Sequence, residues 1–232
     1  STRFKKLTLS GIPSSTYPFL MQLSNAIRDK DVNVSDGIGV LSAVESFLVR
    51  RAICGHEPTG LHAVFKKLWN DCNGQPTELT VKAAIMRHKT VVCPNDDDFK
   101  NAILERPLYK SAVTPFFILE YDLSLKGDAS TVIPWTEHVL PSTLSPDWER
   151  DYTLDQHASL KDTLANLLPL TAEMNMSLSN NSYVVKRKVF ENDSIFKSTR
   201  EFAKTYDSWK PNDLEKRANL LAAWGVIRWP WL

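Results

Sequence analysis

Apolar residues recur at spacings of three and four through the first half of the chain. The pattern is clear in four segments: 16–30, 35–53, 61–72 and 76–88. Because an α-helix turns once every 3.6 residues, this spacing gives each segment one apolar face. Glycine, proline and asparagine separate the segments at CGHEPTG (54–60) and NGQP (73–76). The pattern predicts amphipathic helices that pack on one another, and Thr77 is a candidate N-cap for the fourth.

Further helices are expected near residues 99–105 and through TPFFILEYDL (114–123), where Pro115 is tolerated in the first turn. The polar segment KGDAST (126–131) is the best internal boundary. We therefore predict a helical part over residues 1–125 and a second part over residues 126–232.

The pattern changes after this boundary. TVIPWTEHVL (131–140) is typical of a strand, and LKDTLANLLPL (160–170) of a short helix that runs into an apolar extended piece. SNNSYVVKRKVF (179–190) returns to a helical pattern, and the last 40 or so residues predict two more helices. The predicted fold class is mainly α, with a small β element in the second part.

Composition narrows the class of protein. The chain is 43% apolar and 24% charged, which is ordinary for a soluble globular protein, and it lacks the long apolar run of a membrane span. The start, STRFKKLTLSG, has no apolar region like that of a secretory signal, so a cytoplasmic protein is expected. The cysteines Cys54, Cys72 and Cys93 are widely spaced, which argues against a zinc site or a disulfide framework.

Charge is unevenly placed although the net charge is only +1. Acidic residues dominate from Glu137 to Glu173, whereas basic residues dominate from Lys186 to Lys204. The near-neutral net charge argues weakly against a protein that binds nucleic acid over much of its surface. The basic segment still allows local contacts with DNA.

The candidate chemistry centres on adjacent acidic and imidazole groups in the predicted strand, Glu137 and His138. Asn166 follows in the ANLLPL segment, and Asn175 comes nine residues later. A strand with a carboxylate and a histidine, a loop closed by an asparagine and a helix with a second oxygen ligand form the ββα-metal arrangement of HNH (His-Me finger) endonucleases. Asn180 and Asn181 are rivals for Asn175, and helix capping is the more ordinary role for both.

These segments carry a family resemblance. EHVLP, ANLLPL, LSNNSYVVKRK and EKRANLL resemble, in order and spacing, the C-terminal nuclease domain of GmrSD-type and SspE-type modification-dependent restriction enzymes. Upstream, YPFLMQL and the stretch from VESFLVRRAICG to VFKKLW resemble the helical segment that precedes this nuclease. One departure is Ala165, which stands where the family most often has glycine before the asparagine.

The resemblance implies a metal-dependent HNH DNA endonuclease that acts on phage or modified DNA in bacterial defence, and nicking is the expected form of cleavage. It also implies an N-terminal nucleotide-hydrolysing sensor domain in the full-length protein, so this sequence is expected to be a fragment. The expected fold is a helical bundle with an embedded ββα-metal motif. The expected localisation is the bacterial cytoplasm.

Each position then has an expected role. His138 takes a proton from water, and Asn166 holds the loop by hydrogen bonds to the backbone. Oxygen ligands suit a hard cation, so Glu137 and Asn175 are expected to bind magnesium or manganese. Lys186 matches a lysine of the family and is interpreted as a phosphate contact, with a solvated surface charge as the alternative.

Other basic residues leave two interpretations open. Four residues could extend a track for the DNA backbone or form a solvated surface: Arg187, Lys188, Lys197 and Arg200. Arg50 and Arg51 could equally pack between helices or contact DNA.

Two other function classes remain. A non-catalytic DNA-binding or interaction module could keep an HNH-like shell, and a purely structural helical adaptor would explain residues 1–125 alone. The discriminating feature is whether His138, Asn166 and Asn175 converge in space.

Overall fold

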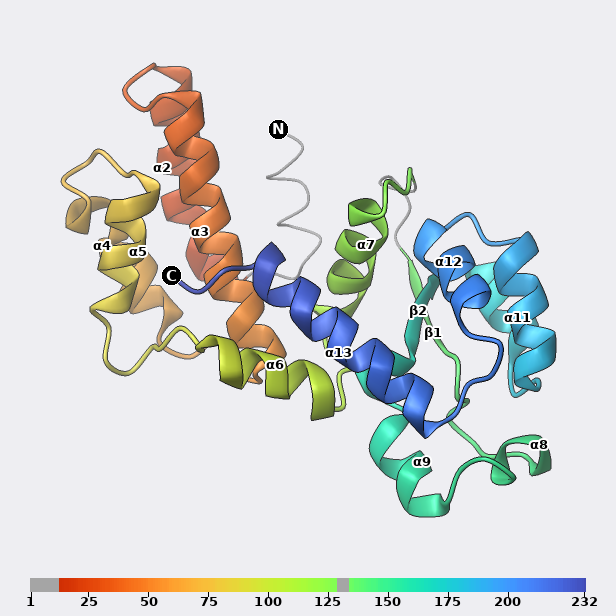
Figure 1. Cartoon of the computed structure of the whole chain (residues 1–232). Coiled ribbons are helices and arrows are strands. Elements are labelled where there is room, and N and C mark those ends of the chain that lie inside the picture. Colours follow the sequence, from red (N-terminus) through yellow and green to blue (C-terminus); the bar gives the residue numbers. More distant parts are fainter. Residues whose placement is uncertain (1–12, 129–133) are drawn as a thin grey trace. The chain divides into compact units, whose positions relative to one another are not determined.

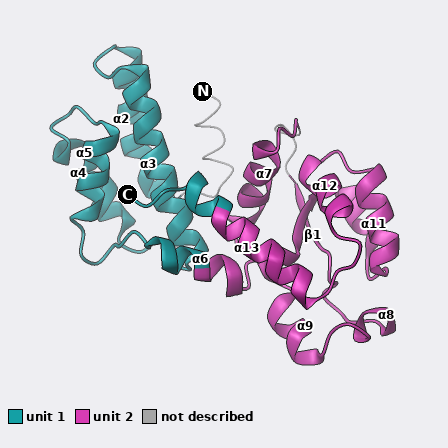
Figure 2. Ribbon diagram, in the orientation of Figure 1, with its two compact units in different colours: residues 1–100, 224–232 teal, residues 101–223 magenta. Residues whose placement is uncertain are grey.

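The computed structural model describes residues 13–128 and 134–232, and helices dominate these residues (Figure 1). The chain forms two compact units (Figure 2). Unit 1 holds residues 1–100 and 224–232, and unit 2 holds residues 101–223. The mainly helical class predicted from the sequence is confirmed.

Unit 1 contains the four predicted amphipathic segments. Its elements are η1 (Ser14–Thr16), α2 (Tyr17–Arg28), α3 (Val34–Ile53), α4 (Leu61–Asp71), α5 (Glu78–Met86) and parts of α6 (Asp96–Glu105) and α13 (Pro211–Arg228). Asn33 caps the N-terminus of α3, and its side chain accepts a hydrogen bond from the Asp36 amide. Thr77 caps α5, as predicted, and exchanges hydrogen bonds with Thr80. Such caps satisfy amide groups that the first helical turn leaves free.

A buried arginine ties the C-terminal segment into unit 1. The Arg50 side chain is fully buried, and its guanidinium donates to the carbonyls of Trp229 and Pro94 at 2.7 and 3.0 Å. It also pairs with Asp96, the first residue of α6. Of the two roles left open for this arginine, the structure supports packing between helices, because the charged group is satisfied inside the unit.

Unit 2 is built around a small sheet. Its elements are α7 (Thr114–Ser124), β1 (Trp135–His138), α8 (Pro146–Glu149), α9 (Leu154–Leu160), η2 (Leu164–Asn166), β2 (Leu167–Leu170), α10 (Ala172–Leu178), α11 (Tyr183–Asn192) and α12 (Lys197–Thr205), with the remaining parts of α6 and α13. The strands pair antiparallel, with Glu137 opposite Leu168 and His138 opposite Leu167. Helix α10 packs on β1, and α7 and α12 pack on β2. The order strand, strand, helix follows along the chain as β1, β2 and α10.

The apolar extended piece predicted after the short helix is β2, and its three leucines are fully buried. The division into units falls earlier than residue 125 because α7 packs on both strands and therefore belongs with them. Residues 129–131 of the predicted boundary, and 131–133 of the predicted strand segment, lie outside the described residues.

Candidate functional site

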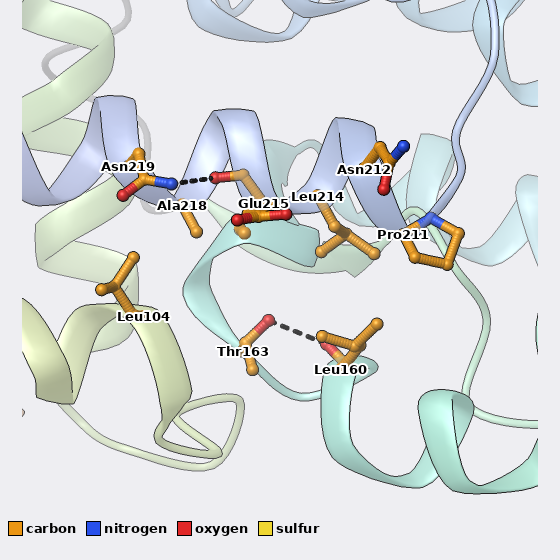
Figure 3. Close-up of a pocket in the computed structure, with 10 residues that line it drawn as sticks. Leu104, Leu160, Thr163, Pro211, Asn212, Leu214, Glu215, Ala218 and Asn219 are labelled. Carbon is orange, nitrogen blue, oxygen red and sulfur yellow. Dashed lines mark hydrogen bonds between the residues drawn. The ribbon is translucent and has the colours of Figure 1, made fainter.

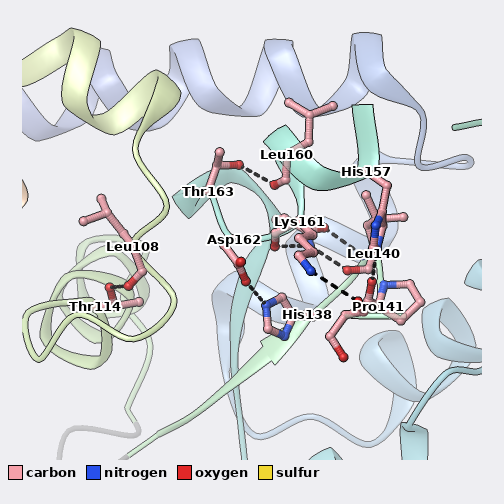
Figure 4. A network of polar contacts seen from close by, with 12 residues as sticks. Leu108, Thr114, His138, Leu140, Pro141, His157, Leu160, Lys161, Asp162 and Thr163 are labelled. Carbon is pink, nitrogen blue, oxygen red and sulfur yellow. Dashed lines mark hydrogen bonds and ion pairs between the residues drawn. The ribbon is translucent and has the colours of Figure 1, made fainter. Parts of the chain in front are cut away.

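Strand alternation sends the two predicted site residues of β1 to different surroundings. Successive side chains of a strand point to opposite faces. Glu137 is buried, with 5% of its surface exposed, and its partner is Lys186 on α11. His138 contacts Asp162, in the loop that follows α9 (Figure 4).

The Lys186 ammonium lies 2.7 Å from Glu137 Oε1 and 2.6 Å from the His138 carbonyl oxygen. Lys186 is 1% exposed, so it is not a solvated surface charge. Burial raises the pKa of Glu137 and lowers the pKa of Lys186, and the attraction between the two groups opposes both shifts. In this arrangement the lysine holds the end of β1. A phosphate contact by Lys186 stays a prediction, and it requires the ammonium to leave this pair.

The His138 ring is restrained on two sides. Its Nε2 atom lies 2.9 Å from Asp162 Oδ1, and the Tyr109 ring centroid is 3.9 Å from the imidazole centroid. Burial is the main cause that lowers the pKa of His138, while the hydrogen bond and charge of Asp162 act in the opposite direction. The net lowering favours a neutral imidazole at neutral pH, which is the form that can accept a proton.

Asn166 is fully buried and ties three backbone groups together. Its Oδ1 atom accepts from the Leu140 amide at 2.7 Å, and its Nδ2 atom donates to the carbonyls of Leu140 and Lys161 at 2.8 and 2.7 Å. The Trp209 indole also donates to Oδ1 at 3.0 Å. These are side-chain bonds to the loop backbone, the type of contact expected for this residue, and they fix the chain just after β1 to the loop before β2.

Further buried groups support the same loop. The Arg217 guanidinium donates to the carbonyls of Ala165 and Leu167, on either side of Asn166, and burial lowers its pKa to about 10. The His157 ring makes a 2.8 Å contact from Nε2 to the Pro141 carbonyl. The backbone around Asn166 is therefore held from α13, and the backbone that follows β1 is held from α9.

Asn175 lies in α10, which begins after Thr171 with a side-chain cap to the Met174 amide and packs on β1. The Asn175 Oδ1 atom is buried and has no hydrogen-bond partner among the described residues. Since buried polar atoms are nearly always paired, this oxygen is available to a donor or a cation. The rival Asn181 uses its carbonyl to accept from the Trp148 indole, and Ser182 rather than either rival precedes α11.

The oxygen atoms available for a metal are few but of the right type. Within residues 13–128 and 134–232, no three His, Cys, Asp or Glu side chains gather as a metal cluster. The Glu137 carboxylate and the Asn175 amide oxygen suit a hard cation that keeps several water ligands, as magnesium does. The unpartnered Asn175 oxygen is the observation that fits such an ion, and Lys186 would have to share Glu137 with it.

The four basic residues predicted for DNA have different surroundings. Arg187 donates to the Ala203 carbonyl at 2.7 Å and pairs with Asp207 at 2.6 Å. Arg200 donates to the Ser194 carbonyl, Lys197 is half-buried at the start of α12, and Lys188 is exposed. The two arginines are thus engaged within unit 2, and Lys188 is the cation of this set most open to a phosphate.

A separate pocket of about 400 Å³ lies on the α13 side of the Asn166 loop (Figure 3). Its lining includes Thr163 and Ala165 from the loop and Leu214 and Glu215 from α13. Neither Glu137, His138 nor Asn175 lines this pocket. The chemistry expected from the sequence therefore lies elsewhere.

The sequence predicted His138, Asn166 and Asn175 as site residues, but it did not indicate Asp162 or Tyr109. A single aspartate 24 positions after His138 has no local signature. Asp162 lies four residues before Asn166, and this position could have identified it. Because Asn166 closes the loop onto β1, the other side chains of that loop are also brought to the strand.

The Asn166 hydrogen bonds generate a stability prediction. Asn166→Ala leaves two buried carbonyls and two N–H donors without their partner, and each buried unpaired group costs about 1 to 3 kcal/mol. We expect the free energy of unfolding to fall by about 3 kcal/mol or more in urea titrations. Asn192→Ala, at an exposed site, is the control and should change it by less than about 0.5 kcal/mol. Equal losses in the two variants would contradict the structural role.

The buried ion pair between Glu137 and Lys186 generates a second stability prediction. Lys186→Ala leaves the Glu137 carboxylate buried without its cation, which typically costs about 3 to 5 kcal/mol. The double variant Glu137→Gln, Lys186→Met carries no unpaired charge and should recover part of that loss. Lys188→Ala, on the exposed face of the same helix, is the matched control in urea unfolding. A Lys186 variant as stable as the Lys188 variant would show that the pair does not form.

The lowered pKa of His138 predicts how stability changes with pH. The unfolded chain binds this proton more readily than the folded protein, whose His138 pKa lies below the ordinary 6.5. The contribution of His138 to the unfolding free energy should therefore decrease as pH falls below about 6.5, and level off below the folded pKa. Urea unfolding of the wild type and His138→Gln across this pH range in EDTA isolates this contribution. A wild type that gains stability relative to the variant on acidification would reverse the sign.

Comparison with known proteins gives a family match over the part of the chain that holds this site. No helix among the described residues is long and apolar enough to cross a membrane. No curated protein matches the sequence. The family model for the C-terminal domain of GmrSD restriction endonucleases matches residues 93–224, which is more than half of the chain and includes all of unit 2. The chain belongs to the family of C-terminal domains of GmrSD restriction endonucleases.

Proposed function

We propose that the chain is a metal-dependent HNH DNA endonuclease domain of a bacterial anti-phage restriction system. The family membership supports a restriction endonuclease domain with nuclease activity in general terms. The observation that carries the finer proposal is the buried, unpartnered Asn175 Oδ1 on a helix that packs against the strand of Glu137 and His138. An oxygen acceptor without a donor is suited to a hard cation, and a neutral imidazole is suited to take a proton from a water nucleophile.

In this proposal His138 is the general base for phosphodiester hydrolysis. A water oxygen forms a bond to phosphorus, and its proton passes to the imidazole. The bond from phosphorus to the leaving 3′-oxygen breaks, and that oxygen takes a proton from solvent water. A neutral imidazole is required for the first proton transfer, and burial keeps His138 in that form near neutral pH. The products are a 5′-phosphate and a 3′-hydroxyl.

Glu137 and Asn175 would hold magnesium or manganese, with water and phosphate oxygens completing the coordination. Such an ion would supply positive charge that stabilises the phosphate and the leaving oxygen. Asn166 keeps the backbone after β1 in place, so that His138 stays in register with the rest of the site. Lys186 holds the Glu137 carboxylate, and Lys188 and Lys197 offer charge for the DNA backbone.

The biological setting belongs to the same proposal. Cleavage of phage or modified DNA would be directed by an N-terminal nucleotide-hydrolysing sensor domain in the full-length protein, in the bacterial cytoplasm. One site per chain reaches one strand at a time, so nicking is the expected outcome. Because the sensor domain would direct cleavage, this domain alone should cleave with low specificity.

A second candidate is a non-catalytic DNA-binding module that keeps the HNH shell. The observation that favours it is the Glu137 and Lys186 pair, in which an ammonium already neutralises the carboxylate that a metal would use. This candidate predicts a folded protein that binds DNA but does not cleave it with any divalent ion.

The test is cleavage of supercoiled plasmid with magnesium or manganese. We expect the parent protein to produce relaxed circles, and we expect His138→Ala to reduce the rate by about 10² to 10⁴, the usual contribution of a general base. EDTA should abolish cleavage in both. His62→Ala, at an exposed histidine of α4, is the matched control and should cleave like the parent.

The outcomes separate the two candidates. Equal rates for His138→Ala and His62→Ala, with both proteins folded by circular dichroism, would remove His138 from catalysis. A parent that binds DNA but leaves the plasmid supercoiled, with and without the sensor domain, would support the non-catalytic module.

A further inference from the structure

We propose that Asp162 is a positioning residue that holds the His138 ring with Nε2 protonated and leaves Nδ1 free to accept the proton from water. This inference rests on the proposed function, because it assigns a partner to the general base. It concerns a residue that neither the strand pattern nor the family resemblance singles out.

The hydrogen bond sets the tautomer. A neutral imidazole carries one N–H donor and one acceptor nitrogen, whereas an ionised carboxylate can only accept. Because Asp162 Oδ1 lies 2.9 Å from His138 Nε2, the shared proton belongs to Nε2. The lone pair is then on Nδ1, on the side of the ring away from Asp162 (Figure 4).

The backbone of Asp162 is itself fixed, so its carboxylate is a defined anchor. The Asp162 carbonyl accepts from the amides of Leu108 and Tyr109 at 2.7 and 3.1 Å. Pro107 and Thr163 form a bridge beside these bonds. On the other side, the Lys161 carbonyl accepts from Asn166 Nδ2. The loop that Asn166 closes onto β1 is thus the loop that presents Asp162 to His138.

Tyr109 completes the restraint. Its ring lies against the imidazole, with centroids 3.9 Å apart and planes tilted by 44°. The two Asp162 backbone bonds place Tyr109, so the same loop fixes both the edge contact and the face contact of His138. With 11% of the His138 side chain exposed, the ring has little room for another orientation.

Asp162 and Glu137 have different partners. Glu137 points to the opposite face of β1 and pairs with Lys186, whereas Asp162 contacts the His138 face. A carboxylate that orients an imidazole and stabilises its protonated form is a recurrent device in hydrolases, and removing its charge there can cost a factor of about 10⁴ in kcat.

Ring ¹⁵N spectra of histidine-labelled protein test the inference directly. The spectra would be recorded in EDTA at about pH 8, where the imidazole is neutral, with His138→Gln used to assign the signal. We expect the wild type to show the Nε2–H tautomer. Asp162→Ala should give a mixture of tautomers, and Asp162→Asn should also admit the Nδ1–H form, because an amide can donate as well as accept. Asp155→Asn, an exposed site on α9, should leave the spectrum unchanged.

Plasmid cleavage provides the second readout. Asp162→Asn should lower kcat by about 10² to 10⁴ with little change in KM for DNA, while Asp155→Asn should cleave like the parent. An Nδ1–H tautomer in the wild type, or an unchanged tautomer in Asp162→Ala, would overturn the inference. So would a normal kcat in Asp162→Asn when His138→Ala is inactive. If His138→Ala cleaves normally, the proposed function fails instead, and the tautomer spectra still report whether Asp162 sets the ring.

Discussion

The side-chain amide of Asn166 is the interaction on which the candidate site depends. It is fully buried, and it joins the backbone after β1 to the backbone before β2 through the amide and carbonyl of Leu140 and the carbonyl of Lys161. Two four-residue strands make too small a sheet to hold a site by themselves. The amide supplies the missing constraint, and the Trp209 and Arg217 side chains extend it into the rest of unit 2.

Because successive side chains of a strand point to opposite faces, β1 presents two separate sets of contacts. Glu137 and Lys186 form a buried pair on one, while Asp162 and Tyr109 restrain His138 on the other. Burial acts on both sets in the same sense, since it disfavours the charged forms of Glu137, Lys186 and His138. The proposed hydrolysis requires a neutral base, and the burial of His138 favours that form.

Local pattern predicted much of this fold, and long-range contacts account for the rest. The four amphipathic segments, the cap at Thr77 and the extended LLPL segment follow from periodicity and capping chemistry, which act over a few residues. The division after residue 100 could not be read in this way, because it depends on α7 packing against the sheet. Nor could the Glu137 and Lys186 pair or the contact of Asp162 with His138, whose partners are 49 and 24 positions apart. The unpartnered oxygen of Asn175 is likewise a property of packing.

Anomalous diffraction from crystals soaked in manganese tests the central claim most directly. The account predicts a manganese peak in contact with Asn175 Oδ1 and the Glu137 carboxylate, and the loss of that peak in Asn175→Ala. A peak at another site, or no peak at a manganese concentration that supports DNA cleavage, would contradict it. Either of those results would mean that the buried Asn175 oxygen is not a metal ligand and that the proposed metal site at Glu137 and Asn175 is wrong.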